Sequence, residues 1–489
     1  MEKKRTKIVA TLSDKRCDPE FIRELYEAGM DVIRINSAHC NVDFVPLIIQ
    51  NARKVSDKIA ILVDTKGPEV RSTICDAPIQ LKKGDMIDII GDPERKSSND
   101  AIYVTYPAFA SDVPVGSVIL FDDGEISLKV EKRRESALEC LIENDGTLGS
   151  RKSVNIPGVK LNLPSLTEKD KKFLEMAAGT GVDFIAHSFV RSKQDVLDVK
   201  AVLKSHNSNI KIIAKIENQE GVDNLDDILD NVYGIMVARG DMGIEIPFEK
   251  IPGIQKMITT KCILRRKPVI VATQMLHSMI TNPRPTRAEV TDIASAIYSQ
   301  TDAIMLSGET ANGKYPVEAV KTMTKVALET EKNKEKFLDI PYVDVTGEIS
   351  AYLAKVAVKT AYRIGARGII ADTVGGRTIR DMASYRGINL ILAQCYSENT
   401  MRELALSYGV YASCQERKKS VDEFIHIALK NLVKTHNLLG AVYASMGNID
   451  KAIKHFQQSQ QIWPGNIDAA KNLHMLIKMK NKNPAAPPG

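Results

Sequence analysis

Eight short apolar segments alternate with stretches of helical periodicity between Lys7 and Ser307. Aliphatic and β-branched runs of this length, bounded by Gly, Pro or Asp, are typical of strands buried on both faces. Their alternation with helices predicts parallel βα units, and eight such units suffice for a closed (β/α)₈ barrel, the TIM-barrel architecture. The predicted strands are KIVATL (7–12), DVIRIN (31–36), IAILVD (59–64), DFIAHS (183–188), IKIIAKI (210–216), GIMVAR (234–239), PVIVAT (268–273) and DAIMLS (302–307).

The interval between the third and fourth strands is far longer than an ordinary βα loop. Residues 67–164 hold several strand-like segments separated by Gly, Pro and Asn-Asp signals, which predict a small inserted β-barrel domain. SLTEKDKKFLEMAAGTG (165–181) then predicts a helix that returns to the barrel. The barrel is therefore expected at 1–66 and 165–340, with the insert placed to act as a lid over its carboxyl end.

The remaining chain predicts two further parts. After a polar link at 341–348, residues 349–437 alternate again and predict an incomplete, open α/β domain whose last helix spans 420–438. Residues 438–480 predict a helical hairpin like a tetratricopeptide repeat, and 481–489 a disordered tail. The repeat-like positions are Leu439, Gly440, Tyr443, Gly447, Ala452, Phe456 and Pro464. One repeat is too little to bury its own faces.

Composition excludes several classes of protein. The net charge of +6 carries no long basic block and does not indicate nucleic-acid binding. No segment reaches the ~18 apolar residues of a membrane span, and the apolar run near the start is too short for a signal peptide. The seven cysteines are odd in number and show no CxxC spacing. Free thiols in a reducing cytoplasm are the simplest expectation.

Polar residues gather just past the predicted strands, whose carboxyl ends meet at one face of a closed barrel. Strand ends are polar in many proteins, but Lys and Glu are rarely buried without partners, so their mixture here favours an active site. The residues concerned are Arg34, Asn36, His39, Asp64, Thr65, Lys66, Glu69, Arg71, Ser188, Arg191, Lys215, Glu217, Arg239, Gly240, Asp241, Thr273, Gln274, Ser307 and Glu309.

Glu217 and Asp241 follow adjacent predicted strands. Two carboxylates, completed by substrate oxygens and water, are a usual Mg²⁺ site. Lys215 precedes Glu217 by two residues, so both side chains point to one side of the strand, and an ammonium there suits stabilisation of a phosphoryl group in transfer. The alternative is that the two acids only pair with Lys215 and Arg239.

Other catalytic motifs are absent or incomplete. GETANGKY (308–315) follows a strand and matches GxxxxGK, but Tyr315 stands where a P-loop needs Ser or Thr. The sequence contains no HExxH or GxSxG, and its eight histidines show no paired spacing. The glycines at 240 and 243 allow a close backbone approach to an anion, although a tight turn without function has the same pattern.

The chain closely resembles pyruvate kinase over residues 1 to about 437. The matching stretches are IRINSAH (33–39), DTKGPEVR (64–71), SVNIPGVKLNLPSLTEKD (153–170), AKIENQEGV (214–222), VARGDMGIEIP (237–247), ATQMLHSM (272–279), PRPTRAEVTDIASA (283–296) and IMLSGETANGKYP (304–316). The resemblance implies a barrel, a lid and a C-terminal α/β domain. It also implies Mg²⁺-dependent transfer from phosphoenolpyruvate to ADP, the last step of glycolysis, by a cytoplasmic homotetramer.

The resemblance also implies roles by position. Arg34, Lys215 and Thr273 are the catalytic candidates: Arg34 binds the phosphoryl group, Lys215 stabilises its charge, and Thr273 lies where the enolate is protonated. The implied ligands are Gly240 and Asp241 for the substrate carboxylate, Glu217 and Asp241 for Mg²⁺, Asn36, His39, Arg71 and Lys152 for the nucleotide, and Asn36, Asp64 and Thr65 for K⁺. Glu69 resembles the acid of potassium-dependent members.

Three departures from the family pattern stand out. Ala38 replaces a serine that usually contacts K⁺, with Ser37 beside it, and His277 replaces a common Glu. The loop 373–378 resembles the family's effector phosphate loop at a helix N-terminus, but after His436 the repeat-like segment stands where two more strands are expected. Sugar-phosphate activation is therefore in doubt.

Two other functions remain open. One is a different barrel enzyme that acts on an enolate or phosphoenolpyruvate, such as a lyase, for which ADP-independent turnover would be diagnostic. The other is a weakened or non-catalytic relative that uses the C-terminal repeat to bind a protein partner. Arg34, Lys215, Glu217, Asp241 and Thr273 are all present, which favours the active enzyme.

Overall fold

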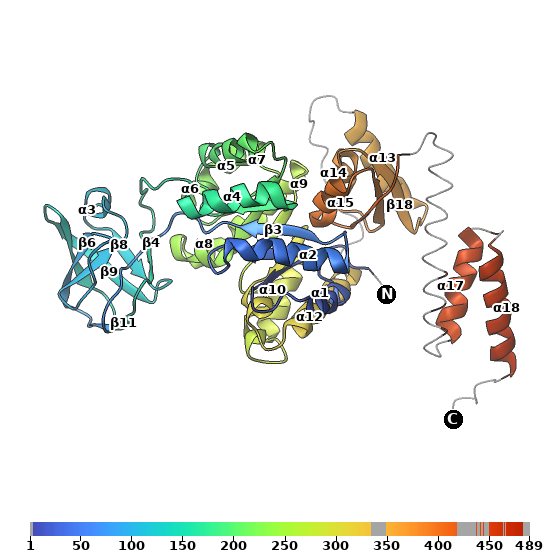
Figure 1. Ribbon diagram of the computed structural model, residues 1–489, viewed down its shortest axis with the longest axis horizontal. Helices are drawn as coiled ribbons and strands as arrows, with labels where there is room; N and C mark the ends of the chain where they lie inside the picture. The colour runs from blue at the N-terminus through green and yellow to red at the C-terminus, as the bar shows by residue number, and fades with distance from the viewer. Residues whose placement is uncertain are drawn as a thin grey trace. The chain divides into compact units, whose positions relative to one another are not determined.

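The computed structural model describes residues 3–333, 349–417, 449–462 and 466–482, together with Asn437, Ala441, Ala444 and Pro464. The chain divides into two compact units, Met1–Cys414 and Gln415–Gly489. Figure 1 shows the chain with many of its helices and strands labelled. The predicted link at 341–348, nearly all of the predicted helix 420–438, most of the first repeat helix and tail residues 483–489 lie outside the described residues.

Eight parallel strands close a barrel in the order β1-β17-β16-β15-β14-β13-β3-β2, which confirms the predicted fold. Each strand lies within its predicted run and is shorter by at most one residue at either end. The strands are β1 (Lys7–Leu12), β2 (Val32–Asn36), β3 (Ala60–Asp64), β13 (Phe184–His187), β14 (Lys211–Ile216), β15 (Gly234–Ala238), β16 (Val269–Ala272) and β17 (Ala303–Leu306).

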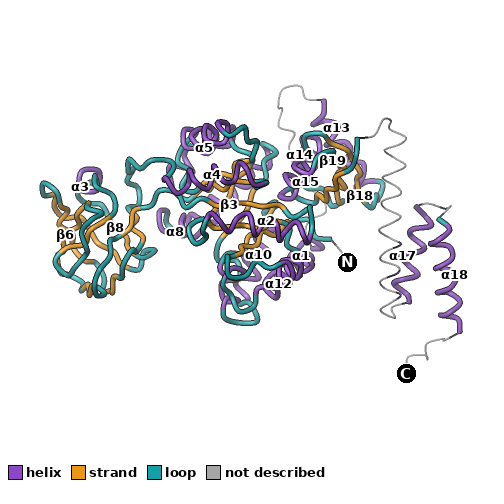
Figure 2. The backbone as a smooth tube through the Cα atoms, in the orientation of Figure 1, coloured by secondary structure: helices purple, strands orange, loops and turns teal. Residues whose placement is uncertain are grey.

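The barrel strands are buried on both faces, as their apolar runs predict. Alternate residues such as Val32, Ile213 and Ile270 fill the barrel interior, while their neighbours such as Ile33 and Ile212 pack under the surrounding helices. Figure 2 shows the strands enclosed by these helices. The helices are α1 (Pro19–Ala28), α2 (Val45–Val55), α4 (Glu168–Thr180), α5 (Lys193–Ser205), α6 (Gln219–Asp223), α7 (Leu225–Asn231), α8 (Arg239–Glu245), α9 (Ile251–Leu264), α10 (Arg287–Tyr298), α11 (Gly308–Ala311) and α12 (Pro316–Asn333), with 3₁₀ turns at Val42–Phe44, Phe248–Lys250 and His277–Ile280.

The segment between β3 and α4 forms the β-rich lid. Its main sheet has the order β4-β12-β8-β9-β10-β6-β7, and a bridge between Ser72 and Val104 joins its two edges. That closure leaves one continuous apolar core, with Phe109, Phe121 and Leu128 fully buried. The lid elements are β4 (Val70–Arg71), β5 (Ile79–Leu81), β6 (Met86–Gly91), β7 (Ala101–Val104), α3 (Phe109–Asp112), β8 (Val118–Phe121), β9 (Ile126–Arg133), β10 (Ala137–Ile142), β11 (Gly146–Leu148) and β12 (Ser153–Asn155).

Both chain connections of the lid are tied to the barrel. Asp170, which caps α4 together with Thr167, also accepts a hydrogen bond from the Lys66 backbone N–H at 2.9 Å. A side chain at Gly67, where φ is +72°, would collide with Ser188 and Phe189, so this connection needs glycine. The lid is therefore anchored beside the carboxyl ends of β3 and β13.

The α/β domain of the first unit contains three parallel strands in the order β18-β19-β20. Its Leu406 packs with Phe184 and Val9 in the interior cluster of the barrel. The domain elements are α13 (Ile349–Arg363), β18 (Gly368–Thr373), α14 (Arg377–Ser384), β19 (Leu390–Cys395), α15 (Glu398–Glu403), a 3₁₀ turn (Leu404–Leu406) and β20 (Val410–Cys414).

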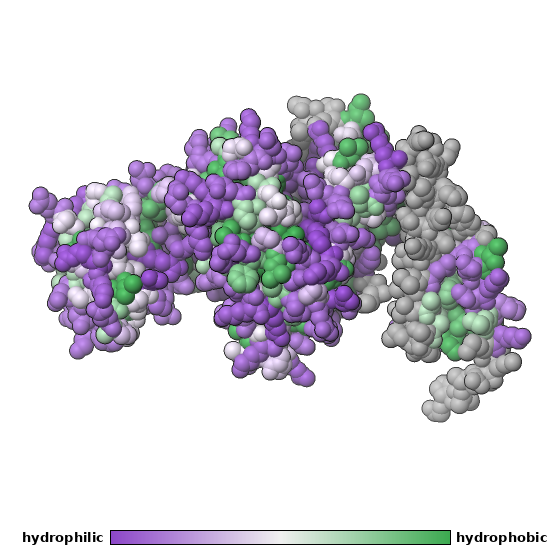
Figure 3. Space-filling view, in the orientation of Figure 1, coloured by the Kyte–Doolittle hydropathy of each residue, from purple (hydrophilic) through white to green (hydrophobic). Residues whose placement is uncertain are grey.

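In the second unit, α17 (Ile449–Ile462) and α18 (Ile467–Lys482) form a helical hairpin. Ala452 and Phe456, two of the repeat-like positions, are buried in it together with Ala469 and Leu476. Within the described residues, no helix has the length and apolar character needed to cross a membrane. Figure 3 shows mainly hydrophilic residues on the visible described surface of the lid and barrel.

Candidate active site

Lys215 is the centre of a buried charge cluster at the mouth of the barrel. Its Nζ lies 2.9 Å from Glu217 Oε1 and 3.1 Å from Asp64 Oδ1. Arg34 Nε donates to Asp64 Oδ2 at 2.7 Å and Arg34 Nη1 donates to Thr11 Oγ1 at 3.0 Å. Side chains from β2, β3 and β14 thus meet as the alternation of each strand predicts.

The cluster perturbs the titration of its own members. Burial would lower the pKa of Lys215, but the carboxylates of Asp64, Glu217 and Asp241 outweigh it and hold that pKa above its ordinary value. Burial raises the pKa of Asp64, yet Arg34 and Lys215 bring it below its ordinary value. Burial also raises the pKa of Glu217, to about 7. The charge of Asp241 contributes to this rise, and the charge of Lys215 opposes it. Lys215 therefore remains a cation in a site surrounded by acids.

Ser188 is a contact of Lys215 to which the sequence assigned no role beyond its place after a strand. Lys215 Nζ donates to Ser188 Oγ at 2.7 Å. That hydroxyl lies 2.6 Å from the Thr65 carbonyl oxygen and 3.2 Å from Asp64 Oδ1, so its single hydrogen points to one of these acceptors. Ser188 is 2% exposed. It holds the Lys215 ammonium in a fixed direction within the buried cluster.

Thr273 and Gly240 join the ends of β16 and β15. The Gly240 N–H donates to Thr273 Oγ1 at 2.8 Å, and Arg239 Nη2 donates to the Thr273 carbonyl at 2.7 Å. Thr273 has φ of +71° and Gln274 has φ of +54°. A left-handed conformation is costly for a β-branched residue and is common at functional sites. A substrate carboxylate that uses the Gly240 N–H must compete with Thr273 for it.

The residues expected to bind Mg²⁺ suit a cation that also takes ligands from substrate. Glu217 is 1% exposed, and its Oε1 faces Lys215 without accepting a well-directed hydrogen bond, while Oε2 accepts from the Phe189 N–H at 2.6 Å. Asp241 is close enough to act on the pKa of both Glu217 and Lys215. In the part of the chain that the structure describes, no group of three or more His, Cys, Asp or Glu residues could hold a metal. A site made of two carboxylates leaves coordination positions for substrate oxygens and water.

The residues expected to bind K⁺ offer oxygen atoms that are already partly engaged. Both oxygens of Asp64 face cations, and Thr65 Oγ1 accepts from the Ser188 N–H at 3.0 Å. Asn36 Oδ1 accepts from the Ala38 N–H at 3.0 Å. Ser37 is fully buried, and its Oγ has no hydrogen-bond partner among the described residues. The unpartnered Ser37 hydroxyl is thus adjacent in sequence to Ala38, the position where the family usually has a serine.

Two of the expected nucleotide residues lie in the lid. Arg71 pairs with Glu69 at 2.8 Å and donates to the Arg151 carbonyl at 2.6 Å, while Lys152 Nζ lies 2.6 Å from Asp122 Oδ2. Arg71 and Lys152 are neighbours because β4 and β12 pair, with Ser153 opposite Arg71. The other two expected residues, Asn36 and the exposed His39, belong to the barrel at the end of β2. The structure thus divides the expected nucleotide residues between the lid and the barrel.

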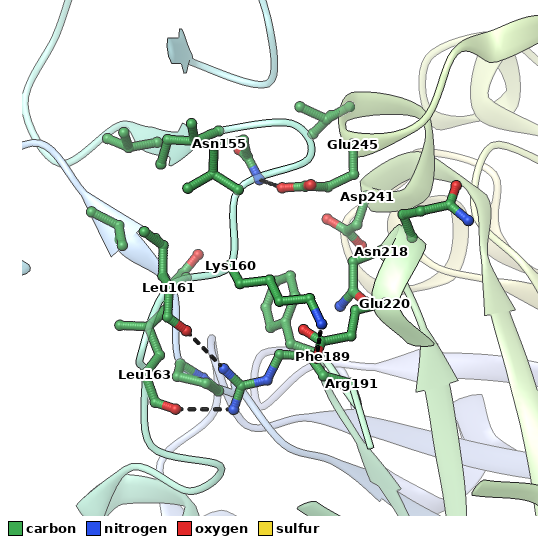
Figure 4. Close-up of a pocket in the computed structure, with 18 of the residues that line it drawn as sticks. Asn155, Lys160, Leu161, Leu163, Phe189, Arg191, Asn218, Glu220, Asp241 and Glu245 are labelled. Carbon is green, nitrogen blue, oxygen red and sulfur yellow. Dashed lines mark hydrogen bonds and ion pairs between the residues drawn. The ribbon is translucent and has the colours of Figure 1, made fainter. Parts of the chain in front are cut away.

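A cavity of about 430 Å³ separates the lid from the barrel, and Arg71, Asp241 and Glu245 are among the residues that line it. Figure 4 shows polar contacts across it. Arg191 donates to the carbonyls of Leu161 and Leu163, Lys160 pairs with Glu220 at 2.9 Å, and Asn155 lies 3.5 Å from Glu245. These contacts hold the segment 155–163, which leaves the lid, against the barrel.

Glu309, another residue of the predicted barrel mouth, has a structural role in this arrangement. It is 2% exposed, and its carboxylate accepts from the Leu276 N–H at 3.1 Å and the Ser307 N–H at 2.7 Å. The exposed His277 follows Leu276. Glu309 therefore ties the loop after β16 to the loop after β17.

Family models of known proteins match most of this chain. The family model described as "Pyruvate kinase, barrel domain" matches residues 3–320, "Pyruvate kinase, alpha/beta domain" matches 352–448, and "Tetratricopeptide repeat" matches 433–466. These matches confirm the resemblance on which the sequence interpretation rests, including the repeat near the C-terminal end.

Similar individual proteins carry the same name. A pyruvate kinase of Borreliella burgdorferi is 50% identical over 435 residues, which cover 88% of this chain and 91% of that protein. One of Geobacillus stearothermophilus is 43% identical over 448 residues, covering 88% and 75%. The crystal structure of a pyruvate kinase from Cryptosporidium parvum superimposes with a TM-score of 0.84 at 35% identity, covering 88% of this chain and 91% of that one.

Proposed function

Because this chain belongs to the pyruvate kinase family and is a phosphotransferase, we propose that its barrel-mouth cluster transfers the phosphoryl group of phosphoenolpyruvate to ADP. The observation that carries the proposal is the contact of Lys215 with Asp64, Glu217 and Ser188. A buried ammonium held at a fixed position stabilises charge on a transferring phosphoryl group without reorganising during the reaction.

The substrate is bound through its two anionic groups. Arg34 and Lys215 hold the phosphoryl group between two cations, which reduces the repulsion between two polyanionic substrates. The backbone around Gly240 and Asp241 receives the carboxylate. Thr273, whose Oγ1 donates to the Ala272 carbonyl at 2.6 Å, lies on the side from which water protonates the enolate.

Glu217 and Asp241 hold Mg²⁺ through one carboxylate each. When bound, the ion supplies positive charge that neutralises phosphoryl oxygens during transfer. The chain contributes Lys215, which keeps Glu217 paired, and the Phe189 N–H, which fixes the orientation of the Glu217 carboxylate.

Asn36, His39, Arg71 and Lys152 bind the nucleotide. Since Arg71 and Lys152 belong to the lid, closure of the lid delivers their charges and excludes water from the transfer. Asn36, Asp64 and Thr65 hold K⁺, and Glu69 is the acid expected in a potassium-dependent enzyme. The unpartnered Ser37 hydroxyl replaces the serine hydroxyl that is missing at Ala38.

We also infer the wider setting of the enzyme. The enzyme catalyses the last step of glycolysis as a cytoplasmic homotetramer. The cysteines support a reducing compartment, because all seven are free thiols.

A coupled assay with phosphoenolpyruvate and ADP, run with and without Mg²⁺ and K⁺, tests the proposal. Lys215→Met should abolish phosphoryl transfer while leaving the fold intact, as far-UV circular dichroism can show. The matched control is Lys211→Met at the opposite end of β14, where Lys211 pairs with Glu403 at 3.3 Å. Full turnover by Lys215→Met, or turnover without ADP, would contradict the assignment.

The repeat motivates a second role, docking of a protein partner by the C-terminal segment. Among its described residues, Ala452, Phe456, Ala469 and Leu476 are buried, whereas side chains such as Ile467 and Met475 are exposed. Deletion of 438–489 tests this role: unchanged kinetics and assembly together with loss of a captured partner would support it, and loss of folding would assign the segment to stability instead.

A further inference from the structure

Cys395 and Cys414 occupy paired positions at the carboxyl ends of neighbouring strands. In the parallel ladder of β19 and β20, Cys395 is the partner of Cys414, and Ala393 is the partner of Ala412. In this sheet β19 lies between β18 and β20. Neighbouring strands lie about 4.8 Å apart. A disulfide requires Cα atoms about 4.4–6.8 Å apart, so the backbone already meets this requirement.

The two thiols also point to the same face of the sheet. Side chains alternate along a strand, so Cys395 shares a face with Ala393 and Ile391, and Cys414 shares one with Ala412 and Val410. Ile391, Ala393, Cys395, Val410 and Ala412 all belong to one apolar cluster. Cys395 and Cys414 are therefore side by side on that face. The Cβ spacing of such a pair is near the strand spacing, and a small shift of the β20 end brings it within the about 3.5–4.5 Å of a disulfide.

The environments of the two thiols differ in a way that assigns them separate roles. Cys395 is fully buried, whereas Cys414 is exposed and is the last residue of β20. Burial, and then the charge of Cys414, raise the pKa of the Cys395 thiol to about 12. An oxidant from solvent therefore reacts with Cys414 first, while the buried Cys395 remains a protonated thiol that solvent does not reach.

We propose that Cys395 and Cys414 form a reversible disulfide when the protein meets a hydroperoxide. The Cys414 thiolate attacks the O–O bond, forming a sulfenic acid and releasing water or an alcohol. The Cys395 sulfur then attacks the sulfenic sulfur, and hydroxide leaves with the Cys395 proton as water. Two thiols lose two electrons in all, and the peroxide O–O bond is reduced.

The bridge would lock the end of β20 to the sheet. Cys414 is also the last residue of the first compact unit, and Gln415 begins the second. On the other side of β19, Thr373 is paired with Cys395, and its Oγ1 accepts from the Gly376 N–H at 2.8 Å at the start of α14. Oxidation therefore restrains both the exit of the chain towards its C-terminal segment and the strand end beside the 373–376 loop.

The test treats the full-length protein with hydrogen peroxide, blocks remaining thiols and maps disulfides by mass spectrometry. The wild type should lose the mass of two hydrogens, yield a linked peptide pair containing Cys395 and Cys414, and return to the reduced mass with dithiothreitol. Cys414→Ser should lose the bridge and should fold normally, because the residue is exposed. Cys75→Ser, at a half-buried cysteine of the lid, is the matched control and should still form the bridge.

Three results would overturn the proposal. One is stepwise addition of oxygen atoms to Cys414 with no linked peptide. Another is loss of two hydrogens that persists in Cys414→Ser. The third is a bridge that maps to Cys17 and Cys40, two cysteines buried in one cluster of the barrel.

Discussion

The Arg386 guanidinium donates two parallel hydrogen bonds to the Asp302 carboxylate, from Nη1 to Oδ1 at 2.7 Å and from Nη2 to Oδ2 at 2.5 Å. Both side chains are buried. Asp302 directly precedes β17, while Arg386 follows α14 in the α/β domain. The same carboxylate accepts from the Val269 and Tyr408 N–H groups at 3.1 and 3.0 Å. One acid therefore joins the amino end of the barrel to the α/β domain.

Arg386→Met should lower the free energy of unfolding by about 3 kcal/mol, because it leaves the buried Asp302 charge without its cation. Chemical denaturation followed by circular dichroism measures the effect. Arg367→Met, at an exposed position of the same domain, is the control and should change little. Equal stability of the two variants would show that the ion pair does not hold the domains together.

Ser188→Ala should lower kcat by about 10- to 100-fold, the cost of one hydrogen bond to a charged group. The KM for phosphoenolpyruvate should change much less, because Lys215 keeps its charge and loses only a fixed direction. Steady-state kinetics separate the two quantities. Ser205→Ala, at an exposed serine of α5, should match the wild type. A rise in KM with unchanged kcat would instead assign Ser188 to ground-state binding.

Ser37→Ala should raise the K⁺ concentration needed for half-maximal activity without changing the Mg²⁺ requirement. The reason is that Ser37 Oγ is the buried, unpartnered hydroxyl beside the expected K⁺ ligands. The thermal stabilisation by KCl in the absence of substrate should shrink in parallel. Thr6→Val is a matched control, since Thr6 Oγ1 is likewise buried and has no partner among the described residues. Identical K⁺ titrations of Ser37→Ala and the wild type would exclude Ser37 as a ligand.

Lys7 should make the protein more stable as the pH rises from about 8 to about 10. Burial, against the attraction of Asp31, lowers the pKa of Lys7 to about 8. Between that value and the ordinary lysine pKa near 10.4, the unfolded chain binds more protons than the folded one. The free energy of unfolding therefore rises with pH, by up to about 3 kcal/mol at 1.4 kcal/mol per unit.

Lys7→Met should remove this rise, and urea denaturation at pH 8 and pH 10 measures it. Lys132→Met, at an exposed residue of the lid, should retain the wild-type difference. A Lys7→Met variant with the same pH dependence as the wild type would show that Lys7 titrates at its ordinary pKa.

The barrel was predictable because its signals are local. A strand buried on both faces is apolar at nearly every position, so KIVATL and AILVD can be recognised as strands from their own residues alone. The proximity of Lys215 and Glu217 was equally predictable, because residues two apart on a strand share a face. By contrast, Ser188 follows a different strand, and no spacing in the sequence links it with Lys215.

The amino-acid sequence by itself determined the eight strands, the family and the set of charged residues at the barrel mouth, since periodicity and motif spacing are properties of short segments. Only the tertiary structure decided which residues are neighbours. It placed Asp64 between Arg34 and Lys215, Arg386 against Asp302, and Cys395 opposite Cys414 in the ladder. Contacts of this kind join segments far apart in the chain, and they exist only after apolar burial has closed the barrel and set the register of the sheet.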